Sequence, residues 1–386
     1  MKYRCESFGG VLALEDPPML VHVDRTFMRE LGCEESPLWQ GPESSILSAP
    51  LEVHFSVTNA CSRRCRDCYM DSGEKDAGEM TGEEFRRAVD VLAEMGVFHV
   101  AMGGGEALER PDFFELAAYV RSCGIVPNLT TNGLLLTRET AAKCRVFGQV
   151  NVSVDWAGHP AGGGARGDAV AGMVTGADLL LDAGVNVGLN CVVTRQNFDH
   201  LDGVMAYAHG RELTDVELLR LKPSGRGKLD YFERRLTPQQ NRAFYPLIRR
   251  LSLEHETAVK IDCSFVPMFC WHGPDRQMME EFSVYGCEAA NILLGVRSDG
   301  RFAGCSFLTG QESIFDLPML WKGSELLSRL RAWASRAPEP CRTCDYLGIC
   351  KGGCRAVAGF VTGSFEAPDL ECPFLDGGHD AYHVKN

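Results

Sequence analysis

The sequence predicts an α/β fold, namely a partial (β/α)6 barrel that follows a short N-terminal β-hairpin element and precedes a cysteine-rich C-terminal domain. Segments typical of strands and of helices alternate six times between residues 51 and 257. Many of the 41 glycines stand in short clusters between apolar runs, as expected of turns between strands and helices. Nine of the 17 cysteines lie beyond residue 258, where this alternation ends.

The first fifty residues are predicted to form a small separate element. The stretch GGVLALEDPPMLVHVD (9–24) indicates two short strands around a proline-rich turn. RTFMRELG (25–32) indicates a short helix that ends at a glycine, and GPESSILSAP (41–50) is typical of a linker. A hairpin of this size is expected to cap the bottom or the side of the barrel.

Each unit of the barrel is a strand followed by a helix, which favours a parallel sheet with helices outside. The helix predicted at 81–96 has Thr81 at its N-cap, Glu84 at the capping-box position and Gly96 at its end. Six units are too few to close an eight-strand barrel, so an open, partial barrel is expected. The strands are predicted at 51–58, 97–105, 125–133, 149–155, 185–193 and 215–225, and the helices at 81–96, 111–124, 137–145, 167–184, 199–210 and 237–256.

Composition indicates a cytoplasmic, soluble protein. The formal net charge of −13 disfavours nucleic acid and anionic membrane surfaces as partners. The N-terminal sequence has no secretory signal pattern, and apolar runs such as ANILLGV are too short to span a bilayer. In a reducing cytoplasm, dense cysteine patterns bind metal more often than they form disulfides.

Three cysteines follow the first barrel strand. CSRRCRDC places Cys61, Cys65 and Cys68 at C-x3-C-x2-C spacing, where loops of parallel barrels carry active sites. A four-iron cluster normally takes four cysteine thiolates, so three would leave one iron open to a substrate or cofactor. The alternative is a three-cysteine zinc site completed by His54 or His99.

This motif resembles the signature of the radical S-adenosylmethionine (SAM) superfamily, and the resemblance covers nearly the whole chain. It implies a [4Fe–4S] cluster whose open iron binds the amine and carboxylate of SAM. One electron then cleaves SAM, and the resulting 5′-deoxyadenosyl radical takes a hydrogen atom from the substrate. It also implies an electron donor such as flavodoxin or ferredoxin.

The same resemblance implies a set of SAM contacts. GGGE ends the second strand, like the family motif whose glycine backbone approaches the methionine amine, although Ala107 replaces the usual proline. Asp67 stands where the family prefers an aromatic residue or histidine, and its backbone is expected to meet adenine. Ser153 and Asp155 are expected near the ribose and Arg166 near the SAM carboxylate. The complete expected set is Asp67, Gly103, Gly104, Gly105, Glu106, Asn132, Ser153, Asp155 and Arg166.

The C-terminal cysteines resemble the SPASM domain, which carries two auxiliary iron–sulfur clusters. The spacing is C-x12-G-x4-C, followed by C-x2-C-x5-C-x3-C and a last cysteine. The resemblance implies that only three of these cysteines, Cys287, Cys305 and Cys354, hold the inner of the two clusters. Either one iron of this inner cluster stays open, or Cys263 or Cys270 is its fourth ligand. Zinc is the alternative metal for these cysteines. The resemblance assigns Cys341, Cys344, Cys350 and Cys372 to the outer cluster and Cys287, Cys305 and Cys354 to the inner one, within domains at 1–50, 51–257 and 258–386.

SPASM-bearing relatives mostly modify ribosomally made peptides. The local resemblance is strongest to the mycofactocin and pyrroloquinoline quinone peptide maturases, through residues 97–120 and LRLKPSGRGK (219–228). We therefore expect an enzyme that abstracts a hydrogen from a peptide and leaves a crosslinked, decarboxylated or oxidised residue. No general base can be named from the sequence.

Two alternatives stand beside the peptide maturase. One is an enzyme of heme or heme d1 biosynthesis that acts on porphyrin propionates, and the other is a non-enzymatic zinc or iron–sulfur protein. Residues 1–50 are too short for the winged-helix domain that recognises leader peptides in many maturases. A separate leader-recognition protein is therefore an expected partner, unless the N-terminal strands pair with a leader by edge addition.

Overall fold

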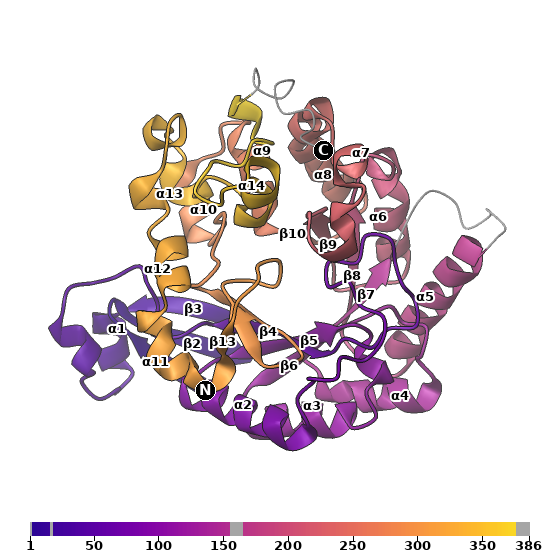
Figure 1. Ribbon diagram of the computed structural model, residues 1–386, viewed down its shortest axis with the longest axis horizontal. Coiled ribbons are helices and arrows are strands. Elements are labelled where there is room, and N and C mark those ends of the chain that lie inside the picture. Colours follow the sequence, from indigo (N-terminus) through magenta and orange to yellow (C-terminus); the bar gives the residue numbers. More distant parts are fainter. Residues whose placement is uncertain (1, 16–17, 155–164, 376–386) are drawn as a thin grey trace.

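The computed structural model describes residues 2–15, 18–154 and 165–375. Seven parallel strands lie side by side in chain order, and an arc of helices covers their outer face (Figure 1). The predicted α/β partial barrel is confirmed, because each of the six predicted units appears in order. The strands are β4 (Glu52–Thr58), β5 (His99–Gly104), β6 (Val126–Thr131), β7 (Val150–Val154), β8 (Val187–Val193), β9 (Asp215–Arg220) and β10 (Val259–Ile261); the helices are α2 (Gly82–Glu94), α3 (Phe113–Ser122), α4 (Arg138–Lys143), α5 (Ala165–Asp182), α6 (Leu201–Gly210) and α8 (Pro238–Glu254).

Local sequence signals explain where these helices begin. The Thr81 hydroxyl accepts from the Glu84 N–H at 3.2 Å, and the Glu84 carboxylate accepts from the Thr81 N–H at 2.8 Å. The predicted capping box is therefore confirmed, and helices α4 and α8 start with the same arrangement at Thr137 and Thr237. Each cap satisfies backbone donors that the helix itself leaves unpaired.

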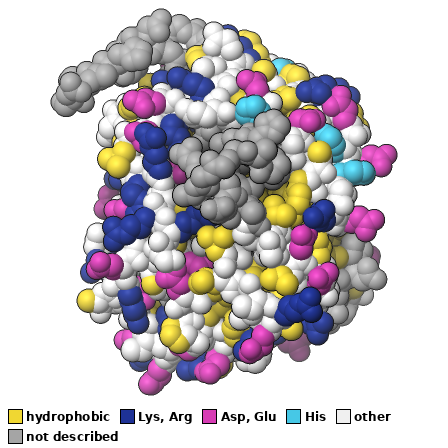
Figure 2. Space-filling model, turned by 90° about the vertical axis from the view of Figure 1, so that its right-hand side faces the viewer, with side chains coloured by type: hydrophobic (Ala, Val, Ile, Leu, Met, Phe, Trp, Pro, Cys, Tyr) yellow, Lys and Arg dark blue, Asp and Glu magenta, His cyan; other side chains and the backbone are white. Residues whose placement is uncertain are grey.

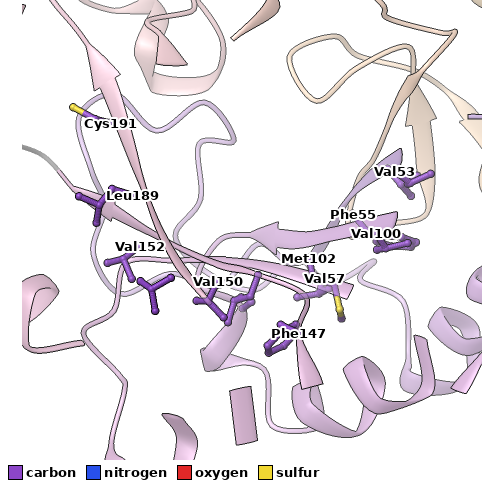
Figure 3. Packing of buried hydrophobic residues seen from close by; sticks show 14 of the residues in the cluster. Val53, Phe55, Val57, Val100, Met102, Phe147, Val150, Val152, Leu189 and Cys191 are labelled. Atoms are coloured by element: carbon purple, nitrogen blue, oxygen red, sulfur yellow. The ribbon is translucent and has the colours of Figure 1, made fainter. Parts of the chain in front are cut away.

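The barrel strands alternate between an apolar and a polar face. Val53, Phe55 and Val57 of β4 and Val100 and Met102 of β5 point into the core against the helices, part of which Figure 3 shows. Parallel strands that are buried on both faces are usually apolar throughout, so the polar face indicates a barrel interior open to water or ligand. The inward-facing residues that line a cavity include Glu52, His54, Ser56, His99, Ala101, Gly103, Asn151, Ser153, Asn190 and Glu217.

The segment after residue 257 contributes to the same sheet at both of its edges. β10 pairs with β9, and β11 (Leu293–Val296) pairs in parallel with β4 at the opposite edge. β12 (Arg301–Ala303) and β13 (Glu312–Ser313) extend that edge in antiparallel orientation. The sequence-based boundary at residue 257 thus falls just before a strand of the barrel sheet.

Short helices make up much of the remaining C-terminal segment, and several stand across the open side of the barrel arc (Figure 1). Proline and glycine recur among them, which keeps each helix short. The helices are α9 (Val266–Cys270), α10 (Arg276–Glu281), α11 (Leu317–Gly323), α12 (Glu325–Arg331), α13 (Leu347–Cys350) and α14 (Arg355–Thr362), and α7 (Tyr231–Arg234) precedes α8.

The N-terminal element is a three-stranded antiparallel sheet. Its strands β2 (Gly9–Glu15) and β3 (Pro18–Asp24) form the predicted hairpin, and α1 (Arg25–Glu30) is the predicted helix. β1 (Lys2–Glu6) is an additional strand that the sequence analysis missed. The Arg4 guanidinium donates to Ala49 O and Pro50 O, both at 2.8 Å. These acceptors lie just before β4, so the element caps the bottom of the barrel.

Within the described residues, none of the helices is long and apolar enough to cross a membrane. Acidic and basic side chains are interspersed over the described part of the face in Figure 2.

Candidate active site

A cavity of about 1440 Å³ lies within the barrel and extends to the C-terminal segment. Its wall combines the inward faces of the strands with loops that follow β4, β10 and β12. Cysteines from both ends of the sequence therefore face one chamber. They are Cys61, Cys65 and Cys68 from the first motif and Cys263, Cys287, Cys305 and Cys354 from the C-terminal segment.

The loop with Cys61, Cys65 and Cys68 leaves β4 and is closed at its base. The Cys61 N–H donates to Gly73 O at 2.8 Å, and the Gly73 N–H donates to Asn59 O at 3.0 Å. The loop between these points contains no regular helix or strand. Its shape must therefore come from contacts with the rest of the barrel.

Arg226 supplies several of those contacts from a 3₁₀ helix after β9 (Gly225–Lys228). Its Nε donates to Cys65 O at 2.8 Å, and its Nη1 donates to Asp71 Oδ1 at 2.7 Å and to Ser72 O at 2.8 Å. Its backbone N–H donates to Cys68 O at 2.9 Å. One arginine thus fastens two of the three cysteine positions and the end of the loop.

Replacing Arg226 by methionine is expected to lower the iron bound by the first cysteine motif and to slow SAM cleavage by about tenfold or more. Hydrogen bonds from a charged donor contribute about 1.5–3 kcal/mol each, and about 1.4 kcal/mol corresponds to tenfold. Iron analysis and 5′-deoxyadenosine formation measure both effects. Arg64→Met is the control in the same loop, because its side chain is largely exposed. Equal losses in the two variants would contradict a fastening role for Arg226.

The glycine run at the end of β5 touches the segment that precedes Cys61. The Gly105 N–H donates to Thr58 O and the Glu106 N–H donates to Ala60 O, both at 2.8 Å. Gly104 has φ +117°, a backbone conformation that favours glycine. A Cβ on Gly105 would lie 2.1 Å from Ala60 O. Glycine is thus required for this close approach between the two predicted motifs.

Glu106 joins the ends of β5 and β6. Its carboxylate accepts from Thr131 Oγ1 and from the Asn132 N–H, both at 2.8 Å, and from the Leu108 N–H at 3.3 Å. Burial raises its pKa, although these hydrogen bonds act in the opposite direction. Glu106 therefore fixes the turn TTNG (130–133), and a direct contact with SAM stays a prediction.

The other predicted SAM contacts divide into three groups. Asn132 and Ser153 line the cavity. Asp67 also lines it, while its carboxylate pairs with Arg234 at 3.1 Å, so its backbone remains the part suited to a ligand. Asp155 lies outside the described residues. Arg166 falls in α5, and its side chain is outside the described part.

Lys222 is a buried cation in the cavity that the sequence analysis did not single out. It pairs with Asp262, and its Nζ lies 4.3 Å from the centre of the Phe307 ring. Burial lowers its pKa, whereas the neighbouring Cys354, Cys263 and Cys305 thiols act to raise it. The sequence LRLKPSG places Lys222 two residues beyond β9, at the cavity end of a strand. This position could have predicted that Lys222 lies near the site.

The outer cysteines meet in a separate place. Cys350 is buried, and its thiol is hydrogen-bonded to Cys270. Burial, with the Cys350 and Cys344 thiols adding to it, raises the pKa of Cys341 to about 11. Burial likewise raises the pKa of Cys372, and Cys350 and Cys341 contribute. The four predicted outer positions are therefore neighbours in space, and their role as cluster ligands stays a prediction.

A buried charge network connects these cysteines to the barrel. Arg220, at the end of β9, donates to both Asp369 oxygens at 2.6 and 3.0 Å and to Glu371 Oε2 at 2.7 Å. Asp369 Oδ2 also accepts from the Cys354 N–H at 3.0 Å, and Glu371 directly precedes Cys372. All three charged side chains are at most 3% exposed. One arginine thereby positions a candidate ligand from each C-terminal set.

His54 does not have a ring nitrogen left for a metal ion. Its Nδ1 lies 3.0 Å from Ser306 Oγ, and its Nε2 lies 3.3 Å from Glu52 Oε1. Within the described residues, no group of three His, Cys, Asp or Glu side chains could hold a single metal ion.

The Glu52–His54 pair predicts a pH dependence of stability. Burial alone would lower the pKa of His54, but the hydrogen bond and charge of Glu52 raise it above 6.5. The pair therefore stabilises the fold fully below about pH 6.5, and this contribution is lost as the pH rises through the folded-state pKa. His54→Gln should flatten this part of the curve of melting temperature against pH. An unaltered curve for His54→Gln would contradict the raised pKa.

Comparison with known proteins identifies the family. The family model described as Radical SAM superfamily matches residues 55–208. The chain is 30% identical over 344 residues to mycofactocin maturase MftC of Mycolicibacterium smegmatis, covering 84% of this chain and 83% of that protein. It is 26% identical over 350 residues to AdoMet-dependent heme synthase of Methanosarcina barkeri (86% and 99% covered) and 26% identical over 348 residues to PqqA peptide cyclase of Bradyrhizobium diazoefficiens (84% and 86% covered).

Solved structures share the fold. Streptococcus suis SuiB, determined with S-adenosylmethionine bound, matches with a TM-score of 0.75 and 18% identity over 96% of this chain and 98% of that chain. SuiB has also been solved with its precursor peptide SuiA. From the order of the strands, the cysteine motifs and these matches, the chain belongs to the radical SAM superfamily and is an enzyme of its SPASM-type subfamily.

Proposed function

We propose that this protein is a peptide maturase that abstracts a hydrogen atom from a ribosomally made peptide and leaves a crosslinked, decarboxylated or oxidised residue. The observation that carries this proposal is the shared cavity, which is lined by the first cysteine motif and by the inner C-terminal cysteines. At about 1440 Å³ it exceeds the range of about 300–1,000 Å³ typical of small-molecule sites. Such a volume suits SAM together with a peptide segment.

The residues present fit the cofactors that the family implies. Cys61, Cys65 and Cys68 would hold the [4Fe–4S] cluster, and the glycine run beside them would bind SAM. When bound, these groups supply the 5′-deoxyadenosyl radical that takes hydrogen from the substrate. The chain itself positions the reactants: Arg226 holds the cysteine loop, and Glu106 holds the turn after β6.

Two auxiliary clusters belong to the same proposal. The outer cysteines would hold one cluster away from the cavity, and the inner ones would hold the other at the cavity wall. The sequence spacing of these cysteines and the burial of the Cys305 and Cys372 thiols support this assignment. We propose the domain division 1–50, 51–257 and 258–386 on this basis, with the qualification that β10 and β11 complete the barrel sheet.

A peptide is favoured over a porphyrin as substrate. PqqA peptide cyclase is named for a peptide substrate, and SuiB has been solved with a bound precursor peptide. Heme synthases match at lower identity than MftC does. The N-terminal sheet is too small for a complete winged-helix domain, so a separate leader-recognition protein is a proposed partner. An electron donor such as flavodoxin or ferredoxin is a second proposed partner, because SAM cleavage needs one electron.

An anaerobic assay tests this function. The reconstituted protein is analysed for iron and sulfide, then incubated with SAM, dithionite and either short peptides encoded beside its gene or coproporphyrin. We expect iron for three clusters, 5′-deoxyadenosine, and a mass change in a peptide. The variant with alanine at Cys61, Cys65 and Cys68 is the control and should form no 5′-deoxyadenosine. A mass change confined to the porphyrin would replace the peptide assignment, and bound zinc without SAM cleavage would overturn the whole proposal.

A further inference from the structure

The inner cysteine set has three members by spacing, and the structure distinguishes the two upstream cysteines that could complete it. Cys263 lines the cavity with Cys287, Cys305 and Cys354, whereas Cys270 is absent from the described residues that line it. We propose that Cys263 is the fourth ligand of the inner auxiliary cluster, which leaves that cluster without an open iron. This inference rests on the proposed auxiliary clusters.

The fold brings Cys263 to the cavity through β10. This strand ends at Ile261, and its parallel pairing with β9 directs its end toward the same edge as Lys222. The Asp262 N–H donates to Leu218 O at 3.0 Å, and the Asp262 carboxylate accepts from the Ser264 N–H at 2.8 Å. Cys263 therefore begins a 3₁₀ turn that is fixed on both sides.

The surroundings of Cys263 are those of a member of the inner set. Its thiol is buried at the cavity wall, and the thiols of Cys287, Cys354 and Cys305 lie near it. Lys222 lies near the same group of cysteines, because the Cys354, Cys263 and Cys305 thiols all interact electrostatically with its ammonium group. Four thiolates would gather negative charge in a buried region, and a buried cation beside them offsets part of it.

Cys270 faces the other way. It is 1% exposed, its thiol is hydrogen-bonded to Cys350, and the thiols of Cys372 and Cys344 also act on it. All of these partners belong to the outer set, which already has four members. Its apolar neighbours are Val266, Met279 and Ile349. Cys270 thus lies beside the outer cluster position and is not placed to serve the inner one.

Four protein thiolates around the inner cluster would change how a substrate can meet it. A substrate could approach the cluster across the cavity wall, but it could not bind an iron atom, because every iron would already have its ligand. If Cys263 is the fourth ligand, the inner cluster is therefore closed and does not anchor a substrate group.

The test uses the full chain with alanine at Cys61, Cys65 and Cys68, so that only the auxiliary clusters remain. This parent is compared with the same chain carrying Cys263→Ala or Cys270→Ala. Each protein is reduced with dithionite, and its EPR spectrum is recorded before and after addition of cyanide, a small ligand for open iron sites. Iron is counted in every sample.

We expect spectra of the parent and of Cys270→Ala that do not respond to cyanide. Cys263→Ala should respond, or should lose about one iron per chain. A parent that responds to cyanide, a response in Cys270→Ala, or an unchanged Cys263→Ala would overturn the assignment. Because the parent measurement needs no further substitution, it stays decisive if Cys263→Ala fails to fold. Loss of all iron from the parent would contradict the auxiliary clusters themselves, which separates the two failures.

Discussion

Replacing Arg220 by methionine is expected to destabilise the fold by about 3–5 kcal/mol and to empty both auxiliary cluster sites. Removal of the guanidinium leaves the Asp369 carboxylate buried without a cation and leaves Glu371 with Arg235 alone, and burial without a partner is the costly state for a charge. Asp369 also accepts a hydrogen bond from the Cys354 N–H, so a movement of Asp369 would displace a candidate cluster ligand directly. Thermal unfolding and iron analysis under anaerobic conditions measure the two effects.

The matched control for Arg220 is an arginine in an exposed pair. Arg29 and Glu35 interact at 2.5 Å, with side chains 49% and 66% exposed. Arg29→Met should leave iron content and melting temperature close to those of the unaltered chain, because water and salt screen such pairs. If Arg220→Met retained all its iron and lost no more stability than Arg29→Met, the network would not be what holds the C-terminal cysteines in place.

Gly105→Ala is expected to reduce SAM cleavage by about a hundredfold while the protein stays folded. The added Cβ would lie 2.1 Å from Ala60 O and 2.9 Å from Asn59 C, and both are backbone atoms that cannot rotate away. The glycine turn must therefore move apart from the segment before Cys61. A misplacement of about 1 Å near reacting groups can lower a rate by about a hundredfold. Initial rates of 5′-deoxyadenosine formation and SAM binding by titration measure the effect.

Alanine substitutions at two other glycines serve as controls for this experiment. A Cβ on Gly78 would meet no atom within 4 Å, and Gly78→Ala should behave like the unaltered chain. A Cβ on Gly103 would meet only Thr130 Cβ, at 4.0 Å. Gly103→Ala should therefore fold normally, so that any loss of SAM affinity would report a direct contact at this position. Full activity in Gly105→Ala would show that the close approach is unimportant.

Much of the barrel could be predicted because its signals are local. The capping box of Thr81 and Glu84 and the alternation in EVHFSVT each lie within a few residues of the chain. β10 and β11 were missed because strands of three and four residues are too short for a period to be seen. Both owe their existence to a neighbouring strand that is distant in sequence.

The candidate site likewise contains some residues that the local sequence could predict and others that it could not. The first motif and the two C-terminal sets were predicted from motifs that resemble those of known families, and their role as cluster ligands stays a prediction. Cys263 and Cys270 could not be told apart, since both precede the set and neither has a spacing rule. The pairing of Lys222 with Asp262 was also beyond the sequence, because it joins the ends of β9 and β10 across a whole helix.

The pairing of β11 with β4 bears on how the chain is synthesised. β4 leaves the ribosome long before β11, and until β11 arrives its outer edge offers unpaired backbone groups to any neighbouring strand. A chain that stopped at residue 257 would keep that edge open and would be prone to self-association. The cysteine-rich segment therefore protects the barrel from aggregation, and the two halves are expected to be obtained intact only when they are made as one chain.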